Sequence, residues 1–378
     1  MTTQTVSLDL DQFDSWIDDE SDVAALVLRQ WLEPVDGKDG IIFPPTYAKP
    51  ERTRDEDWTG YNIDRIDERT SVCQIDSVGS QANRMEPIFL REGYRELVPS
   101  VVIRAEVKGE MKEVNLLEAG HRAADAIVRF SSLAGDLRSA FMAIRSEGNA
   151  VPLARIAPTS LVFGAWDSRD TQVKLPRIVR SVIRAYGVRP LHRSAQYVPP
   201  LDYVEEGVLE APTNKTQEDS MSELGLRHAP AVWTHGGVLV DGEIRREASL
   251  NLVALRALAA GPGEDPLPLR RYILGLALVA FTAPQETFLR EGCQLVPATD
   301  LPPEWKVVHH DGTREDFDLS HAVAKEYAKL ASDAFEVGAA RIAEFDAKAA
   351  RQAVEQSKEE RKKTRRQAAG GGEGRVGA

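Results

Sequence analysis

The chain has 378 residues, of which 42% are hydrophobic and 28% charged, an ordinary composition for a soluble globular protein of one elaborated domain or two. Its longest apolar run, at residues 272–281, is about half as long as a membrane crossing needs, so we expect no membrane partner. The two cysteines, Cys73 and Cys293, are too few for a disulfide framework and fit a reducing cytoplasm. The acidic N-terminus lacks the pattern of a signal peptide.

The formal net charge of −12 is unevenly spread along the chain. Residues 1–70 hold 17 acidic against 7 basic side chains, whereas residues 151–200 hold 2 acidic against 8 basic ones. Because binding of nucleic acid responds to the local patch more than to the total charge, the acidic composition does not exclude RNA as a ligand.

The predicted elements begin with a short amphipathic helix near residues 24–32, followed by mostly irregular chain. A strand is predicted at residues 71–78, and Ser80 is expected to cap a short helix that Pro87 limits. Strict alternation of side chains over residues 101–108 predicts a half-exposed strand.

The middle of the chain contains two predicted helices with a strand between them. Residues 115–130 have a helical pattern, with Asn115 as the cap and Glu118 in a capping-box position. Residues 158–166 are predicted to form a strand, and residues 177–186 the helix that follows it.

The last third contains one long apolar helix, predicted at residues 268–281, and a closing strand at residues 293–297. Residues 249–258 are apolar without a clear period, and the chain from about residue 322 is rich in alanine and charge and helical in pattern.

The irregular alternation of strands and helices predicts an α+β fold, or a split β-α-β of the ferredoxin-like kind, more than a regular doubly wound sheet. The predicted division is an acidic segment at 1–70, a main domain at 71–300, a helical appendage at 301–350 and a charged, glycine-rich, disordered tail at 351–378.

A basic island, RIVRSVIRAYGVR at residues 177–189, is the first candidate binding surface. On a helix, Arg177, Arg180 and Arg184 fall on one narrow stripe opposite an apolar side. Phosphates neutralise such a stripe well, because the guanidinium group is planar and permanently charged. The alternative is a solvated helix face paired with acidic residues of the N-terminal segment. The basic character extends to Arg169, Lys174, Arg189 and Arg193.

A second candidate is SVGSQANR at residues 77–84, where small residues, exposed amides and Arg84 make a phosphate cradle at a helix start. The glycine spacing is not that of a Walker loop. The alternative is a simple turn from a strand into a helix.

A third candidate lies at residues 228–247, where Trp233 is placed to stack on a base and Arg245 and Arg246 to touch RNA. A hairpin with its turn is the alternative for this segment.

Motifs for an enzyme are weak. His309, His310 and Asp311 lack further ligands at zinc-like spacing, and we predict a solvated loop there. There is no nucleophile elbow, and neither cysteine lies in a nucleophile motif. We therefore expect no catalytic residue, no metal ion and no cofactor.

Three strings resemble, in this order, a known family: IDSVGSQANRMEPIF (75–89), LLEAGHRAADAIV (116–128) and THGGVLVDGEIRREASLNLVALRAL (234–258). The chain resembles the CRISPR-associated RAMP superfamily, and within it the Csb-type, Cas-seven-like backbone subunit of the subtype I-U (or I-G) Cascade surveillance complex. The resemblance covers roughly residues 70–300, where LREGCQLVP (289–297) is similar to the closing strand of that family.

The resemblance implies an RRM-like palm with inserted finger and thumb elements, in a non-catalytic subunit that oligomerises along a CRISPR RNA. It implies that the bases of the guide pair with a target DNA strand. The implied partners are copies of the same chain, a large subunit and a Cas-five/Cas-six-like subunit. Motif matching assigns RNA binding to Ser80, Gln81, Asn83, Arg84, Arg245 and Arg246.

Catalysis is the open alternative. Some related backbone proteins cut target RNA with a thumb-loop aspartate, and Asp241 lies in a candidate loop. Because the resemblance is to a type I protein, we predict no cleavage. The rival function is a RAMP-fold endoribonuclease that processes CRISPR RNA through a histidine such as His121, His192 or His235.

Overall fold

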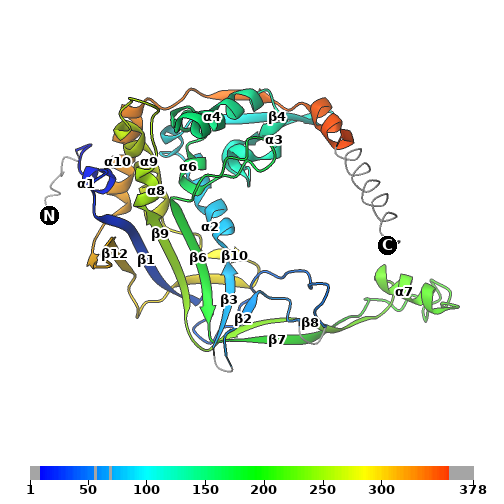
Figure 1. Cartoon of the computed structure of the whole chain (residues 1–378). Coiled ribbons are helices and arrows are strands. Elements are labelled where there is room, and N and C mark those ends of the chain that lie inside the picture. The colour runs from blue at the N-terminus through cyan, green and yellow to red at the C-terminus, as the bar shows by residue number, and fades with distance from the viewer. Residues whose placement is uncertain (1–8, 55–57, 68–69, 357–378) are drawn as a thin grey trace, which may run out of the picture.

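The computed structural model of the chain describes residues 9–54, 58–67 and 70–356 (Figure 1). An antiparallel sheet runs through the middle of the molecule, a block of helices lies over one end of it, and a two-stranded arm projects from the other end (Figure 1). This combination of helices with antiparallel strands confirms the predicted α+β class. Within these residues, no helix combines the length and the apolar character that a membrane crossing requires.

The main sheet has nine strands, in the order β10-β11-β1-β9-β6-β3-β2, and β12 pairs with both β1 and β13. β3 and β11 confirm the strands predicted at residues 71–78 and 293–297. The strands are β1 (Val23–Pro34), β2 (Ile63–Arg65), β3 (Ser71–Asp76), β6 (Val179–Tyr186), β9 (Ile244–Asn251), β10 (Phe288–Arg290), β11 (Cys293–Pro297), β12 (Glu304–His309) and β13 (Arg314–Asp316).

The helix predicted near residues 24–32 is wrong, because this segment belongs to the long strand β1. Leu26 and Leu28 are buried while Arg29 is exposed, which is the two-residue period of a strand. β9 pairs with one edge of β1 and β12 with the other. Both partners come from much later in the chain, so a local pattern does not reveal them.

The helix predicted at residues 177–186 is also wrong, since β6 lies here between β3 and β9. Its valine and isoleucine residues favour a strand once neighbours are available on both edges. Arg180 and Arg184 lie on the open face of the sheet, and Arg177 precedes the strand. The predicted single stripe of arginines is therefore absent, and the three side chains lie in different surroundings.

The opposite face of the sheet is covered by helices α2 (Val78–Met85) and α9 (Leu267–Thr282), which share one core with Leu26 and Leu250. α9 confirms the helix predicted at residues 268–281. Helix α10 (His321–Phe335) packs on α9 and confirms the helical pattern after residue 322. Two short helices, α1 (Asp14–Ile17) and α8 (Leu252–Arg256), lie at the same end.

The start of α2 differs in detail from the prediction. Ser77, and not Ser80, is the cap, because its side chain accepts a hydrogen bond from the backbone N–H of Ser80. Pro87 does limit the helix, which gives way to the 3-10 helices η2 (Glu86–Leu90) and then η3 (Arg95–Leu97).

The block of helices contains two further errors of the prediction. Residues 115–130 are not one helix but two 3-10 turns and the short helix α3 (Ala126–Arg129), although the capping box of Asn115 and Glu118 is confirmed. Arg122 has a positive φ of 53°, which a continuous helix does not allow. The block is completed by η4 (Leu116–Glu118), η5 (Arg122–Ala124), α4 (Ala134–Glu147), α5 (Val151–Ala154) and α6 (Thr159–Phe163).

The strand predicted at residues 158–166 is instead the helix α6, all of whose residues are buried. An apolar run that is buried on every side has no period from which helix and strand can be distinguished. Residues 249–258, which had no clear period, divide between the end of β9 and α8.

A small sheet and the arm complete the fold. β4 (Val101–Val107) confirms the half-exposed strand and lies between β5 (Glu110–Asn115) and the parallel strand β14 (Arg341–Glu344). The arm consists of β7 (Val188–Tyr197) and β8 (Ala229–Val240), with α7 (Lys215–Glu223) at its tip (Figure 1). β8 pairs with β7, whereas β9 pairs with β1 and β6, so residues 228–247 are not a hairpin.

The part of the chain after residue 300 contributes strands to the main sheet and to the small sheet. Residues 301–350 supply β12, β13 and β14 as well as α10. Residues 347–356 are helical, which contradicts the predicted disorder for residues 351–356. The rest of the predicted tail, residues 357–378, lies outside the described residues.

Candidate nucleic-acid interface

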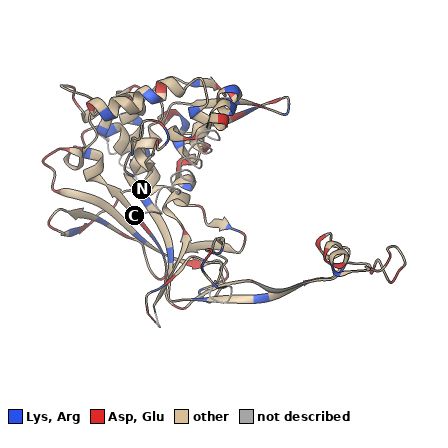
Figure 2. Ribbon diagram, turned by 45° about the vertical axis from the view of Figure 1, so that its right-hand side comes forward, with Lys and Arg blue, Asp and Glu red and all other residues tan. Residues whose placement is uncertain are grey.

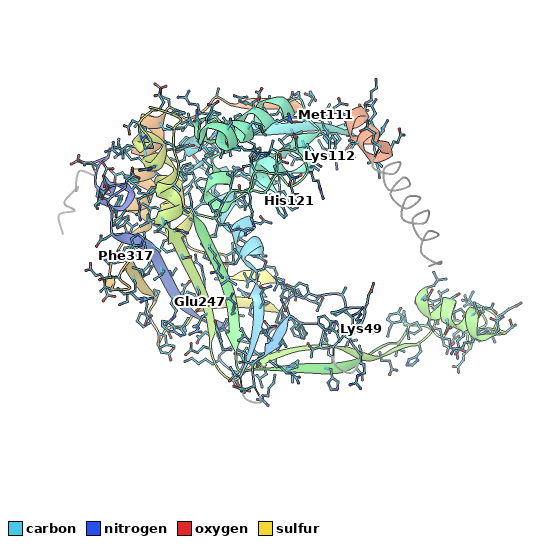
Figure 3. All side chains as sticks on the ribbon, in the orientation of Figure 1. Lys49, Met111, Lys112, His121, Glu247 and Phe317 are labelled. Atoms are coloured by element: carbon cyan, nitrogen blue, oxygen red, sulfur yellow. The ribbon has the colours of Figure 1, made fainter. Side chains whose placement is uncertain are left out.

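A cavity of about 550 Å³ opens between the block of helices and the chain that leads into β6. Its wall comes from residues 120–129, 164–169 and 174–177. His121, one of the wall residues, lies on the side of the block that faces the arm (Figure 3).

Cationic side chains dominate this wall, although both signs of charge are interspersed over the ribbon as a whole (Figure 2). The two carboxylates of the wall already accept hydrogen bonds from the protein itself. Asp125 accepts hydrogen bonds from the backbone N–H of His121 and of Ile127, each at 3.1 Å. Asp167 accepts from the backbone and the hydroxyl group of Thr171, at 2.9 and 2.8 Å. The cations of the wall are Arg122, Arg129, Arg169, Lys174 and Arg177.

Arg122 differs from the other cations because it is buried against a carboxylate. Its Nε lies 2.7 Å from Oε2 of Glu86, and the two side chains are 5% and 2% exposed. The guanidinium group also lies 5.1 Å from the centre of the Phe163 ring. Burial raises the pKa of Glu86 to about 7 and lowers the pKa of Arg122. Across residues 9–54, 58–67 and 70–356, no ion pair forms at the other four: Arg129, Arg169, Lys174 and Arg177.

Trp166 stands at the same wall and is 58% exposed. The ammonium group of Lys174 lies 5.6 Å from the centre of its ring. Sequence reasoning did not select this tryptophan, because residues 158–166 were assigned to a strand. The signal that could have found it is an aromatic residue within the most basic segment of the chain.

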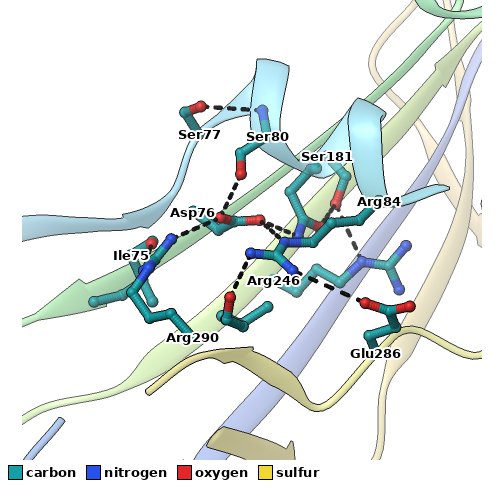
Figure 4. A network of polar contacts seen from close by, with 11 residues as sticks. Ile75, Asp76, Ser77, Ser80, Arg84, Ser181, Arg246, Glu286 and Arg290 are labelled. Carbon is teal, nitrogen blue, oxygen red and sulfur yellow. Dashed lines mark hydrogen bonds and ion pairs between the residues drawn. The ribbon is translucent and has the colours of Figure 1, made fainter. Parts of the chain in front are cut away.

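The motif at residues 77–84 surrounds a buried carboxylate (Figure 4). Asp76 has no exposed surface and accepts hydrogen bonds from the hydroxyl of Ser80 at 2.8 Å and the amide of Gln81 at 2.7 Å. Nε of Arg84 donates to it at 3.0 Å, and Arg290 of β10 donates at 3.3 Å. These polar groups are thus used inside the protein, and contact between RNA and Ser80, Gln81 or Arg84 stays a prediction.

Arg246 belongs to the same interior network rather than to the surface. It is 3% exposed, and its Nε donates to the hydroxyl of Ser181 at 3.1 Å. Ser181 in turn donates to Gln81 at 2.8 Å (Figure 4). Burial lowers the pKa of Arg246 to about 10. The structure therefore places this predicted RNA contact beneath α2.

Arg184 and Arg245 lie on the open face of the main sheet and are paired there with carboxylates. Arg184 donates to Glu247 at 3.1 Å. Arg245 lies 3.6 Å from Glu243 and 4.0 Å from the centre of the Tyr186 ring. The predicted alternative of pairing with acidic residues thus holds for Arg184, although the partner belongs to β9 and not to the N-terminal segment.

Among the predicted RNA-binding residues, Arg177 lines the cavity, and Asn83 contacts Arg122 of its wall. Arg177 is exposed in its wall. Asn83 is exposed at the end of α2, and its Oδ1 accepts a hydrogen bond from Arg122 at 3.4 Å. Arg180 is exposed as well, but it does not line the cavity.

One protein family is similar to the N-terminal half of the described residues. Residues 26–190 match the family model described as CRISPR-associated protein GSU0053. Over these residues, which are less than half of its length, the chain is similar to this CRISPR-associated family. The resemblance to a CRISPR-associated protein is therefore confirmed, while no curated protein sequence matches the chain.

The matched part of the chain contains every residue of the cavity wall, together with most of β1 and all of α2 and β6. Arg245 and Arg246 lie beyond it. Trp233 also lies beyond it, in β8, and its side chain is outside the described part of the structure.

The remaining candidates lie in the arm and at the turn that follows it. Asp241 is paired with Arg189 through two hydrogen bonds of 2.6 and 2.8 Å. His192 and His235 lie opposite each other in β7 and β8, so only His121 of the three predicted histidines is in the cavity wall.

His309 is less solvated than predicted, because it ends β12 and is partly buried, whereas His310 is exposed in a turn as predicted. Nδ1 of His309 lies 3.1 Å from Asp22, and Nε2 of His310 lies 3.3 Å from Arg256. No group of residues in the described part of the chain could hold a metal ion. The two cysteines are free and buried, and burial raises the pKa of Cys73 to about 12 and of Cys293 to about 11.

Proposed function

We propose that the chain is an RNA-binding backbone subunit of a type I CRISPR interference complex, and that the cavity holds phosphates of the CRISPR RNA. The observation that carries this function is the group of four cations without carboxylate partners: Arg129, Arg169, Lys174 and Arg177. Such charges repel one another unless anions neutralise them, and phosphate suits the guanidinium group in shape and charge. The similarity of residues 26–190 to a CRISPR-associated family supports RNA as the source of these phosphates.

We assign the RRM-like palm to four strands of the main sheet and to the two helices that cover one face of it. In chain order these are β1, α2, β6, β9, α9 and β12, and in space the strands follow the order β12-β1-β9-β6. This order, with both helices on one face, supports a ferredoxin-like split β-α-β arrangement. The segment from β4 to α6 is inserted between α2 and β6 and is assigned to the finger, and the arm of β7 and β8 to the thumb.

In this function the subunit grips the backbone and leaves the bases free to pair with a target DNA strand. Copies of the chain stack along the guide in the cytoplasm, together with a large subunit and a Cas-five/Cas-six-like subunit of the Cascade complex. The subunit breaks no bond, and it uses neither a cofactor nor a metal ion.

The test is RNA binding by the full chain, purified with and without a co-expressed CRISPR RNA. Recovery of a defined small RNA is expected, and its absence would contradict the proposed function. A charge-reversal variant of the cavity, Arg129→Glu with Arg169→Glu and Arg177→Glu, is titrated with single-stranded RNA at several salt concentrations. Its salt slope should fall by about 2, because each phosphate contact on a single strand contributes about 0.7.

The matched control for this variant reverses three exposed cations that lie outside the cavity and form no ion pair within residues 9–54, 58–67 and 70–356. These are Lys112→Glu, Arg180→Glu and Arg314→Glu. The control carries the same change in total charge, so it should keep the salt slope of the wild type. An equal loss in both variants would show that the cavity is not the site.

The rival function, processing of precursor RNA, has one supporting observation, since His121 lines the cavity and is exposed to it. A general acid or base must lie within hydrogen-bonding reach of the reacting group. Incubation with precursor RNA separates the two functions. Cleavage at a defined position that His121→Ala abolishes would replace the proposed function with processing.

A further inference from the structure

The exposure of Trp166 has no explanation in the packing of the protein. Of the aromatic side chains in the described part of the chain it is the most exposed, at 58%, ahead of Phe288 at 54% and Tyr197 at 49%. Indole carries the largest apolar surface of any side chain, and a ring left in water at a concave basic wall is typical of a ligand contact.

The loop that carries Trp166 is held in place by many contacts. Backbone hydrogen bonds join Leu175 to Ala165 at 2.7 Å and Asp167 to Val173 at 2.9 Å. The buried carboxylate of Asp167 binds Thr171 through both backbone and hydroxyl. The ring is therefore not the tip of a mobile loop.

Helix α4 anchors the same loop from outside. Arg138 contacts both oxygens of Asp170 at 3.1 Å, and Arg145 donates to the carbonyl of Thr171 at 2.8 Å. A platform fixed before binding avoids the entropic cost of ordering it afterwards. Many contacts thus hold the loop that carries one exposed ring, which is what a binding surface for a ligand requires.

The surroundings of Trp166 specify the ligand. The cavity of about 550 Å³ lies within the range of small-molecule sites, roughly 300–1,000 Å³, and so accommodates one nucleotide. Lys174 lies over the ring, and the exposed surface of Trp166 is available to an aromatic partner. Arg129, Arg169 and Arg177 provide charge for a phosphate beside it. An aromatic platform next to cations is the combination with which proteins bind single-stranded nucleic acid.

We infer that the cavity is a subsite for one splayed nucleotide, whose base stacks on Trp166 and whose phosphate binds the adjacent arginines. This rests on the proposed function and adds to it a position at which the base, and not only the backbone, is held. Stacking requires an exposed base face, so the subsite accepts unpaired nucleotides of any sequence and rejects duplex.

The test uses the full chain and a single-stranded RNA of mixed sequence. Trp166→Ala should weaken binding by about 5- to 150-fold, the range that stacking of a base on an aromatic ring provides, with the salt slope unchanged. Trp166→Phe keeps an aromatic ring and should retain most of the affinity. The matched control is Trp31→Phe on the open face of the main sheet, where the indole donates to Glu243 at 2.9 Å outside the cavity.

A second ligand identifies the base as the contact. RNA with abasic residues should bind the wild type more weakly by the factor that Trp166→Ala loses, and should bind wild type and variant equally. An unchanged affinity of Trp166→Ala for intact RNA would overturn the stacking site and leave the phosphate sites in place. Failure of the wild type to bind any RNA would overturn both this subsite and the proposed function.

Discussion

Nε of Arg84 lies 3.0 Å from the carboxylate of Asp76, which has no exposed surface. A motif that looks like a phosphate cradle in the sequence therefore surrounds an anion that the protein itself supplies. Ser80, Gln81 and Arg84 lie on α2 and all bind the carboxylate at the end of β3, so the motif fixes the helix on the strand. The cavity differs from this motif, because four of its cations have no ion pair in the described part of the chain: Arg129, Arg169, Lys174 and Arg177.

Replacing Asp76 with alanine should lower the free energy of unfolding by about 3 kcal/mol, because it leaves the guanidinium groups of Arg84 and Arg290 without their buried partner. Thermal or urea unfolding measures this loss. Glu286→Ala is the matched control, since Glu286 contacts the same Arg84 at 3.9 Å but is 52% exposed, and should cost less than about 1 kcal/mol. Equal costs for the two variants would refute the central role of Asp76.

The three arginines that a helical pattern grouped together should behave differently when each is changed to glutamate. Only Arg177→Glu, in the cavity wall, should weaken RNA binding and lower its salt slope, by about 0.7 or more. Arg180→Glu should leave both unchanged. Arg184→Glu should instead lower stability, because it faces Glu247 at 3.1 Å. Filter binding and melting curves separate the three, and a loss of RNA binding in Arg180→Glu would contradict this assignment.

Gly275 of α9 permits close packing of α10. A Cβ atom at this position would lie 2.8 Å from Cα of Ala328, nearer than two carbon atoms approach without a shift of the helices. Gly275→Ala should therefore destabilise the protein by about 1–3 kcal/mol. Gly135→Ala in α4 is the control, as nothing lies within 4 Å of its Cβ, and it should be neutral or stabilising by up to about 1 kcal/mol. A neutral Gly275→Ala would show that the two helices are less tightly packed.

The buried pair of Glu86 and Arg122 should make stability depend on pH. Burial raises the pKa of Glu86 from 4.5 to about 7, so the folded state holds this proton more tightly than the unfolded state does. Relative to Glu86→Gln, the wild type should keep its full stability below pH 4.5 and lose stability as the pH rises to about 7. Melting temperatures from pH 4 to pH 8 test this, with the exposed Glu147→Gln as control. The opposite slope would mean that Arg122 outweighs burial and lowers the pKa.

The sequence was informative where local chemistry decides the structure. The capping box of Asn115 and Glu118, the apolar helix α9 and the alternating strand β4 all depend on residues close to one another in the chain, and all three were predicted. Local reasoning failed for β1 and β6, whose amphipathic patterns fit a helix equally well until partners from distant segments pair with both edges.

The candidate site was only partly accessible from the sequence for the same reason. The excess of basic residues between 151 and 200 was visible, and Arg177, Arg169 and Lys174 in it do meet at the cavity. The sequence does not reveal which cations are paired or buried inside the protein, because strand pairing determines the surroundings of Arg246 and Arg184. Trp166 was missed since its exposure follows from α6, which was predicted as a strand.

The position of β1 has a consequence for the way the chain reaches its folded form. β1 is made well before its neighbours β9, β11 and β12, which belong to residues 244–309. A nascent chain therefore carries an apolar strand with both edges unpaired until those residues have been made. Contacts between segments so far apart in the sequence slow folding and leave the strand exposed to aggregation. Expression of this chain should therefore respond strongly to chaperones and to low temperature.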